Sequence, residues 1–157
     1  MARSISVEQS RAIPVTVEDA FARTLPIPLT NICSQWYGLF PPIKEVREQS
    51  GDWDAPGQTR VIAMVGGGSL REQLTSVDPP QSFAYTLSGI TGPMAPLVST
   101  IDGKWSFTPA GTGTNVTWQW TIHAKSDLAA HLLPVLGKMW KGYARVTLEK
   151  LSRQLVG

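Results

Sequence analysis

The last part of the chain carries the feature that most restricts the fold, a helical pattern too long to stand alone. From Pro134 to about Leu155 no further proline occurs, and apolar residues recur at about 100° per residue. The residues on this predicted apolar face are Leu132, Val135, Leu136, Met139, Tyr143, Val146 and Thr147, and those on the opposite face are Lys138, Lys141, Arg145, Glu149 and Arg153. A helix of roughly 20 residues, about 30 Å long, must bury such a stripe on a broad surface.

The middle of the chain supplies that surface as a series of short strands. Alternating apolar and polar residues are interrupted by turns rich in glycine, proline and aspartate, such as Gly66-Gly67-Gly68 and Asp78-Pro79-Pro80-Gln81. The spacing predicts strands over residues 4–12, 43–49, 59–65, 70–77, 82–87, 99–108 and 114–124. Strands joined by turns this short are typical of an antiparallel meander.

Two short helices are expected between the first strand and the meander. Thr16 is a candidate N-cap for a helix over residues 17–25, and a second helix is expected over residues 29–38, before Pro41-Pro42. Together these elements predict an α+β fold. A curved antiparallel sheet of about seven strands wraps around one long C-terminal helix, and residues 1–157 form a single domain.

Strand alternation places many aromatic side chains on the sheet face toward the helix. The predicted inward sets are Leu70, Glu72 and Leu74; Phe83, Tyr85 and Leu87; Ile101, Gly103, Trp105 and Phe107; and Val116, Trp118, Trp120 and Ile122. A straight helix cannot lie flush on a strongly curved sheet. The space between them is therefore either a cavity or a volume filled by these side chains, and a mostly apolar pocket with a few polar groups is the usual small-ligand site.

Glu72 is a charged residue on an otherwise apolar wall, and Arg60 is a possible partner for its carboxylate. Folding the preceding hairpin about its glycine turn, near Gly67, pairs Met64 with Leu70 and brings Arg60 diagonally within reach of Glu72. The pair is either structural or a polar anchor for a ligand. Burial raises the pKa of a carboxyl, but a neighbouring arginine lowers it again, which weakens an acid–base role.

Five stretches of the chain, taken in order, resemble one superfamily. They are Ser10-Arg11-Ala12-Ile13-Pro14-Val15 with Val17-Glu18-Asp19-Ala20-Phe21; Pro56-Gly57-Gln58-Thr59-Arg60; Arg71-Glu72; Val77-Asp78-Pro79-Pro80 leading to Tyr85; and Gly111-Thr112-Gly113-Thr114-Asn115-Val116-Thr117-Trp118 before the final helix. In this order they resemble the Bet v 1-like, lipid-transfer (START) and polyketide cyclase/dehydrase superfamily, with its helix-grip fold. The resemblance implies a hydrophobic molecule bound between the sheet and the last helix.

The resemblance and the face assignments together give a candidate ligand site. Its expected residues are Arg60, Glu72, Leu74, Tyr85, Leu87, Met94, Trp105, Phe107, Trp118, Trp120, Met139, Trp140 and Tyr143. The preferred hypothesis is a binding protein for a lipid or polyketide-like molecule. Two alternatives stay open: a polyketide cyclase or dehydratase that uses Arg60, Glu72 and Tyr85, and a non-enzymatic interaction domain whose cavity is filled.

Three tryptophans and one loop are expected to lie around the opening of the cavity. Trp36, Trp53 and Trp140 are expected near the mouth of the cavity. The loop over residues 89–96 is rich in glycine and proline but carries apolar residues, including Met94. We expect it to be either a gate over the open end of the cavity or a plain connecting loop.

Composition excludes several other classes of protein. The 14 basic and 12 acidic residues give a net charge of +2, which argues against a nucleic-acid binder. His123 and His131 have no acid at helical spacing, so no metal site and no cofactor is expected. Cys33 is the single cysteine, which excludes an internal disulfide, and it is expected to be an apolar filler.

The chain also lacks the pattern of a membrane or exported protein. It contains no run of about 18 apolar residues, so we expect no transmembrane segment. Its N-terminus turns polar before the apolar core of a signal peptide could form. A soluble cytoplasmic protein of bacterial type is the expectation, with a hydrophobic small molecule as partner and an undetermined oligomeric state.

Overall fold

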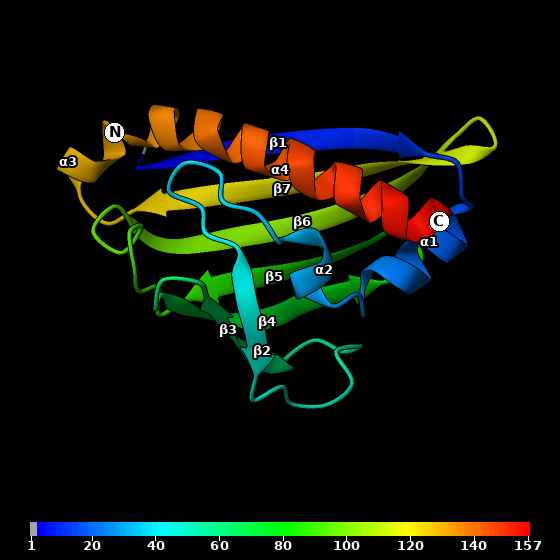
Figure 1. Cartoon of the computed structure of the whole chain (residues 1–157), viewed down its shortest axis with the longest axis horizontal. Coiled ribbons are helices and arrows are strands. Elements are labelled where there is room, and N and C mark those ends of the chain that lie inside the picture. The colour runs from blue at the N-terminus through cyan, green and yellow to red at the C-terminus, as the bar shows by residue number, and fades with distance from the viewer. Residues whose placement is uncertain (1–2) are drawn as a thin grey trace.

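One antiparallel sheet curves around a long C-terminal helix in the computed structural model, which describes residues 3–157 (Figure 1). The sheet has seven strands in the order β1-β7-β6-β5-β4-β3-β2. Their bounds are β1 Ser4–Ile13, β2 Ile43–Arg47, β3 Thr59–Met64, β4 Ser69–Asp78, β5 Ser82–Ser88, β6 Val98–Ala110 and β7 Gly113–Ala124. The α+β helix-grip architecture predicted from the sequence is confirmed.

Four helices accompany the sheet: α1 Val17–Thr24, α2 Leu29–Ile32, α3 Asp127–Ala130 and α4 Leu133–Val156. The predicted cap of α1 is present, because the backbone N–H of Asp19 donates to the Thr16 hydroxyl at 3.1 Å. Helix α2 is much shorter than the predicted span of residues 29–38. Cys33 leaves the helical conformation, and a tight turn follows in which Tyr37 and Phe40 form an isolated β-bridge.

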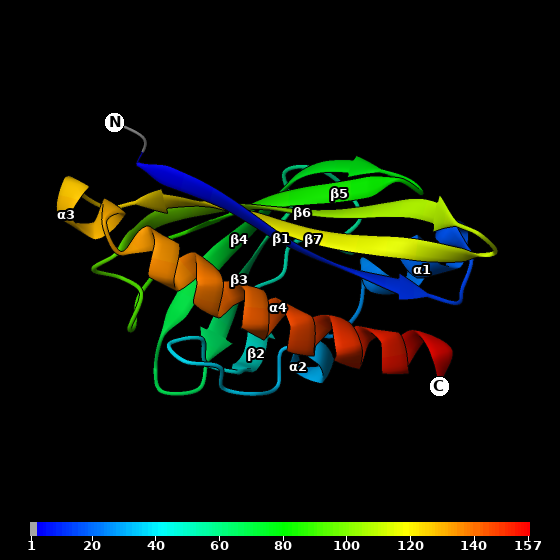
Figure 2. The ribbon, with the colours of Figure 1, turned by 90° about the horizontal axis from the view of Figure 1, so that it is seen from above.

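Helix α4 crosses the concave side of the sheet (Figure 2). It faces the sheet with a different side from the one predicted. Its buried residues are Leu133, Leu136, Gly137, Trp140, Tyr143, Ala144, Thr147, Leu148, Leu151 and Leu155. This face is rotated from the predicted one by roughly one residue position, about 100°. Small residues set the contact: a Cβ on Gly137 would lie 2.6 Å from the Ile5 side chain, so glycine lets the helix approach β1. Leu132 and Val135 are therefore left 49% and 63% exposed.

The hairpin between β3 and β4 also differs in register from the prediction. Ile62 lies opposite Leu70, and Arg60 lies directly opposite Glu72 rather than diagonal to it. The hairpin is centred one residue earlier than predicted, on Gly66, and the Met64 N–H donates to the Gly68 carbonyl at 2.8 Å. Gly66 and Gly67 both have positive φ, which permits this tight connection. The shift brings the two charged side chains face to face.

The inward strand sets predicted from alternation are buried as expected. Val116, Trp118, Trp120 and Ile122 of β7 are each at most 6% exposed, while the residues between them are only partly buried. No helix within residues 3–157 is long and apolar enough to cross a membrane.

Candidate functional site

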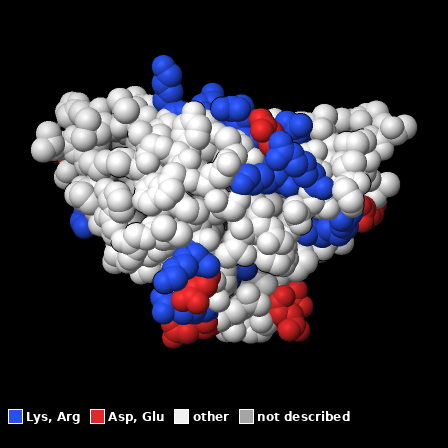
Figure 3. All heavy atoms as spheres, viewed as in Figure 1, with Lys and Arg blue, Asp and Glu red and all other residues white. Residues whose placement is uncertain are grey.

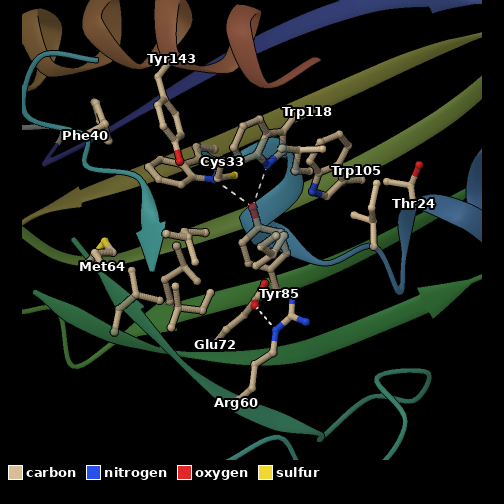
Figure 4. A pocket seen from close by; sticks show the side chains of 18 of the residues that line it. Thr24, Cys33, Phe40, Arg60, Met64, Glu72, Tyr85, Trp105, Trp118 and Tyr143 are labelled. Carbon is tan, nitrogen blue, oxygen red and sulfur yellow. Dashed lines mark hydrogen bonds and ion pairs between the residues drawn. The ribbon is translucent and has the colours of Figure 1, made fainter. Parts of the chain in front are cut away.

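A cavity of about 70 Å³ lies against the concave face of the sheet (Figure 4). Its wall combines residues of β2 to β7, the end of α1, helix α2, the flanking loops and Tyr143 of α4. The lining residues are Thr24, Leu25, Ile27, Leu29, Ile32, Cys33, Phe40, Pro41, Ile43, Arg60, Ile62, Met64, Leu70, Glu72, Phe83, Tyr85, Leu87, Met94, Trp105, Trp118, Trp120 and Tyr143. The tryptophans of the sheet thus line a space rather than fill it completely.

A buried ion pair forms the charged part of the wall. The Arg60 Nε donates to Glu72 Oε1 at 2.6 Å, and the side chains are 7% and 6% exposed. The guanidinium also lies over the Trp53 ring, 3.9 Å from its centroid, so Trp53 supports the pair rather than the mouth of the cavity. Burial raises the pKa of the Glu72 carboxyl above its usual range, and the Arg60 charge offsets part of that rise.

Tyr85 is the polar centre of the cavity. Its hydroxyl oxygen accepts hydrogen bonds from the indole N–H groups of Trp118, at 2.7 Å, and Trp120, at 2.9 Å (Figure 4). These two bonds occupy both acceptor positions of the oxygen. Its own proton finds no acceptor among the described residues, and burial raises the pKa of Tyr85, which keeps the phenol protonated. The Tyr85 O–H is therefore a buried donor with unused capacity.

Gly103 makes this arrangement possible. It lies opposite Tyr85 in the pairing of β5 with β6. A Cβ at position 103 would come within 2.1 Å of Tyr85 Cζ. The ring therefore lies across the backbone of β6 and reaches the indoles of β7, the next strand. Sequence alternation placed Gly103 on the inward face, but only the three-strand geometry shows why it must be glycine.

The indoles around the Tyr85 hydroxyl form a stacked array. Trp105 stacks on Trp118 with ring centroids 4.9 Å apart, and Trp140 lies 5.1 Å from Trp118 and 5.4 Å from Trp120. Trp105 lines the cavity, and its indole N–H makes no hydrogen bond within residues 3–157. Figure 4 shows its nitrogen on the side toward the Tyr85 hydroxyl. The cavity thus holds a second donor with unused capacity.

Nine of the thirteen residues expected at the site lie in the cavity wall: Arg60, Glu72, Tyr85, Leu87, Met94, Trp105, Trp118, Trp120 and Tyr143. The other four lie elsewhere. Trp140 is fully buried behind Trp118 and Trp120, away from any mouth. Met139 faces Gly38 because α4 is rotated, and its sulfur lies 3.0 Å from the Leu39 backbone nitrogen.

Leu74 and Phe107 are core residues outside the cavity wall. Leu74 is completely buried, and Phe107 packs edge-on against Phe21 of α1, with ring centroids 5.6 Å apart. Helix α1 fills this end of the space beneath the sheet. Arg23 joins it to the end of α4 by donating to the carbonyls of Gln154 and Leu155. The cavity is therefore confined to the remaining part of the concave face.

Residues 24–43 form a part of the cavity wall that the sequence did not predict. Leu25, Leu29, Cys33 and Phe40 lie on short elements with no long apolar period. Their place is set by contacts across the fold, such as the stacking of Phe40 on Tyr143, with ring centroids 5.2 Å apart. Met94 is buried and lines the cavity, so the loop over residues 89–96 supplies a wall residue.

We expect the buried thiol of Cys33 to react slowly. Burial raises the pKa of Cys33 to about 11, and the thiolate is the reactive form. We expect native protein at pH 8 to react with Ellman's reagent at least about a hundredfold more slowly than a small thiol of ordinary pKa. Protein unfolded in guanidinium chloride should react at the ordinary rate, and rapid reaction of the folded chain would show that the cavity wall opens.

The histidines contribute nothing to the cavity. His123 Nε2 lies 2.9 Å from Asp102 Oδ2, and both side chains are exposed on the outer face of the sheet. Within residues 3–157 no group of three or more His, Cys, Asp or Glu side chains could hold a metal ion. The polar chemistry of the cavity thus comes from the ion pair, the phenol and the indoles.

Comparisons with known proteins agree on the fold. The sequence profile of a family described as polyketide cyclase / dehydrase and lipid transport matches residues 4–156. A search of curated protein sequences gave no match. Among solved structures, ginseng major latex-like protein 151 from Panax ginseng is similar with a TM-score of 0.71 and 11% identity, covering 99% of this chain and 100% of that one.

Two further structures have the same fold at low identity. Norcoclaurine synthase from Thalictrum flavum, solved in complex with dopamine and hydroxybenzaldehyde, has a TM-score of 0.68 and 13% identity, covering 98% of this chain and 87% of that one. Ara h 8.0201 has a TM-score of 0.67 and 17% identity, covering 98% of each chain. These likenesses establish the shared architecture.

Proposed function

Because the chain belongs to the polyketide cyclase, dehydrase and lipid transport family, we propose that it binds a hydrophobic small molecule that carries an acceptor oxygen. The observation that supports this most directly is the Tyr85 hydroxyl, which is buried in an apolar cavity with its proton unused. A buried donor without an acceptor is costly. A ligand carbonyl or hydroxyl oxygen placed between Tyr85 and Trp105 would accept from both.

The size of the cavity sets the scale of the ligand. A volume of 70 Å³ holds a few water molecules at most, and an engineered protein cavity that binds benzene measures about 150 Å³. Binding even one aromatic ring therefore requires side chains of the cavity wall to move. Met64 and Met94 are the flexible side chains best suited to move, since methionine adapts readily to its surroundings. The loop over residues 89–96 would act as the gate in this proposal.

A matched pair of probes tests the role of the Tyr85 hydroxyl. Acetophenone and ethylbenzene have nearly the same shape, but only acetophenone carries a carbonyl oxygen. Replacing Tyr85 with phenylalanine should weaken acetophenone binding about fivefold, the usual worth of one hydrogen bond, and leave ethylbenzene binding nearly unchanged. Dissociation constants from calorimetry or ligand-observed NMR give the comparison.

Tyr37→Phe is the control for this substitution, because Tyr37 lies outside the cavity, packed against Gly142. It should alter neither affinity. If Tyr85→Phe weakens both probes equally while the protein remains folded, the hydroxyl does not recognise the ligand oxygen. If neither probe binds to the wild type, the cavity does not open to a single ring.

A second candidate, a cyclase or dehydratase, draws support from one observation. Burial raises the pKa of Glu72, which would help that carboxyl exchange protons with a substrate. Its 2.6 Å bond from Arg60 opposes this role, since arginine stabilises the carboxylate. Replacing Glu72 with glutamine separates the two functions: abolished turnover of a polyketide-like substrate with binding retained would favour the enzyme.

A further inference from the structure

An apolar strip crosses one end of the molecule, over the start of α4 and the loops beside it. The exposed large hydrophobic residues at this end are Trp36, Leu39, Val65, Leu128, Leu132 and Val135, and among the described residues only Val156 is exposed in the same way elsewhere. On the face seen in Figure 3, this end shows almost no lysine, arginine, aspartate or glutamate atoms. The charged side chains gather toward the other end of α4 and below.

Contacts between the loops and α4 connect several of these residues. Val135 and Met139 lie one turn apart on α4, and the Leu39 backbone nitrogen lies 3.0 Å from the Met139 sulfur. At the other side of this loop, the Trp36 ring lies 3.8 Å from the position that a Cβ would take on Gly66, beside Val65. The apolar strip therefore runs from the first turns of α4 through the loop over residues 34–40 to the β3–β4 turn.

The loop beside α4 leaves part of this apolar surface uncovered. The loop over residues 34–40 covers the flank of α4 at Met139, Gly142 and Tyr143, where the Tyr37 ring packs against the glycine and Phe40 stacks on Tyr143. One turn earlier Val135 stays 63% exposed, and Trp36 stays 53% exposed. Contiguous exposed apolar surface of this kind marks an interaction site.

The charges bordering the apolar strip are mostly positive. Residues 33–42, 64–69, 89–98 and 125–141 contain one carboxylate, Asp127, which is ion-paired with Arg3 at 3.2 Å. The same segments contain three lysines, Lys125, Lys138 and Lys141. A second copy docked through the same surface would bring the same lysines to it and no unpaired carboxylate from these segments. A negatively charged partner is the one that complements it.

We propose that the apolar strip docks on the surface of an anionic lipid bilayer. Half-exposed tryptophan is the side chain best suited to the interface between headgroups and acyl chains. Lysines beside it add attraction to anionic headgroups. The strip also adjoins the cavity wall: Met64 directly precedes Val65, and Gly92, in the loop that holds Met94, lies against Gly68. A docked protein would hold its flexible wall against the membrane, where hydrophobic molecules concentrate.

Vesicle sedimentation tests this docking without any knowledge of the ligand. Wild-type protein should sediment with vesicles of phosphatidylcholine and phosphatidylglycerol, and more weakly with phosphatidylcholine alone. The double variant Trp36→Ser/Val135→Ser should lower the partition coefficient at least about tenfold, because two apolar anchors are lost. Lys138→Gln should lower it up to about fivefold for anionic vesicles only. Val156→Ser, the same kind of change at the other end of α4, should have no effect.

Trp36 also reports its own position. It is the one half-exposed tryptophan, since the other five are at most 6% exposed, so brominated lipids should quench part of the fluorescence in the wild type and none in Trp36→Phe. Failure of the wild type to sediment with anionic vesicles would overturn the proposal, and so would equal binding by Trp36→Ser/Val135→Ser. Concentration-dependent dimerisation that Val135→Asp abolishes, without vesicle binding, would assign the surface to a second copy. These outcomes are independent of whether acetophenone binds in the cavity.

Discussion

Replacing Glu72 with alanine is expected to lower the free energy of unfolding by about 3–5 kcal/mol. The substitution would leave the Arg60 guanidinium buried without a counter-charge, held only against the Trp53 ring. Removing one member of a buried ion pair is far more costly than removing both, because the remaining charge loses its compensation. Urea denaturation followed by circular dichroism gives the free energy, provided that the m-value is unchanged.

Two variants show whether the cost comes from the unpaired charge. Glu45→Ala removes the carboxylate of the half-exposed pair with Arg47, and it should cost at most about 1 kcal/mol. The double variant Arg60→Met/Glu72→Leu removes both buried charges and should recover most of the lost stability. A loss below about 1 kcal/mol in Glu72→Ala would mean that water reaches Arg60, and that the pair does not act as a buried structural contact.

Replacing Gly103 with alanine is expected to cost about 3 kcal/mol, the sum of overpacking and lost hydrogen bonds. The new methyl group would occupy space that the Tyr85 ring takes, with only 2.1 Å between Cβ and Tyr85 Cζ. The ring would have to move away from Trp118 and Trp120, whose indole N–H groups would then lack their acceptor. Thermal or urea unfolding measures the loss, and the indole N–H signals in NMR spectra report the two hydrogen bonds.

A double-mutant cycle identifies the cause. In a Tyr85→Ala background there is no ring to displace, so adding Gly103→Ala should cost much less than it does in the wild type. An equal cost in both backgrounds would place the clash elsewhere, for example in the backbone of β6. The absence of a side chain at position 103 would then not explain how Tyr85 reaches across β6 to the indoles of β7.

Local periodicity predicted most of the fold. The alternation in β7 assigned Trp118 and Trp120 to the inward face, because a strand has only two faces and one of them carried every large apolar residue. The period of α4 predicted its length equally well. Its orientation was predicted wrongly, because the buried face also includes Trp140, Leu148 and Leu151, which the predicted face lacked. The close approach of Gly137 to Ile5 depends on contacts between distant parts of the chain.

The cavity was only partly predictable, for a physical reason. Arg60, Glu72 and Tyr85 lie on regular strands, so their side could be inferred from neighbours in the sequence. Cys33 and Phe40 lie on short irregular segments whose place depends on contacts with α4, more than a hundred residues away. The sharing of one phenol oxygen by two indoles involves strands β5 and β7 across β6, and no pattern within one segment encodes it.

Native mass spectrometry of the protein purified from its own host, followed by solvent extraction, tests the central claim most directly. We expect a non-covalent adduct that leaves on extraction, and an extracted molecule that is mostly apolar and carries at least one acceptor oxygen. The Tyr85→Phe protein from the same host should retain less of it. Protein that carries no adduct, and that also fails to bind acetophenone, would contradict the proposal that this cavity binds a ligand.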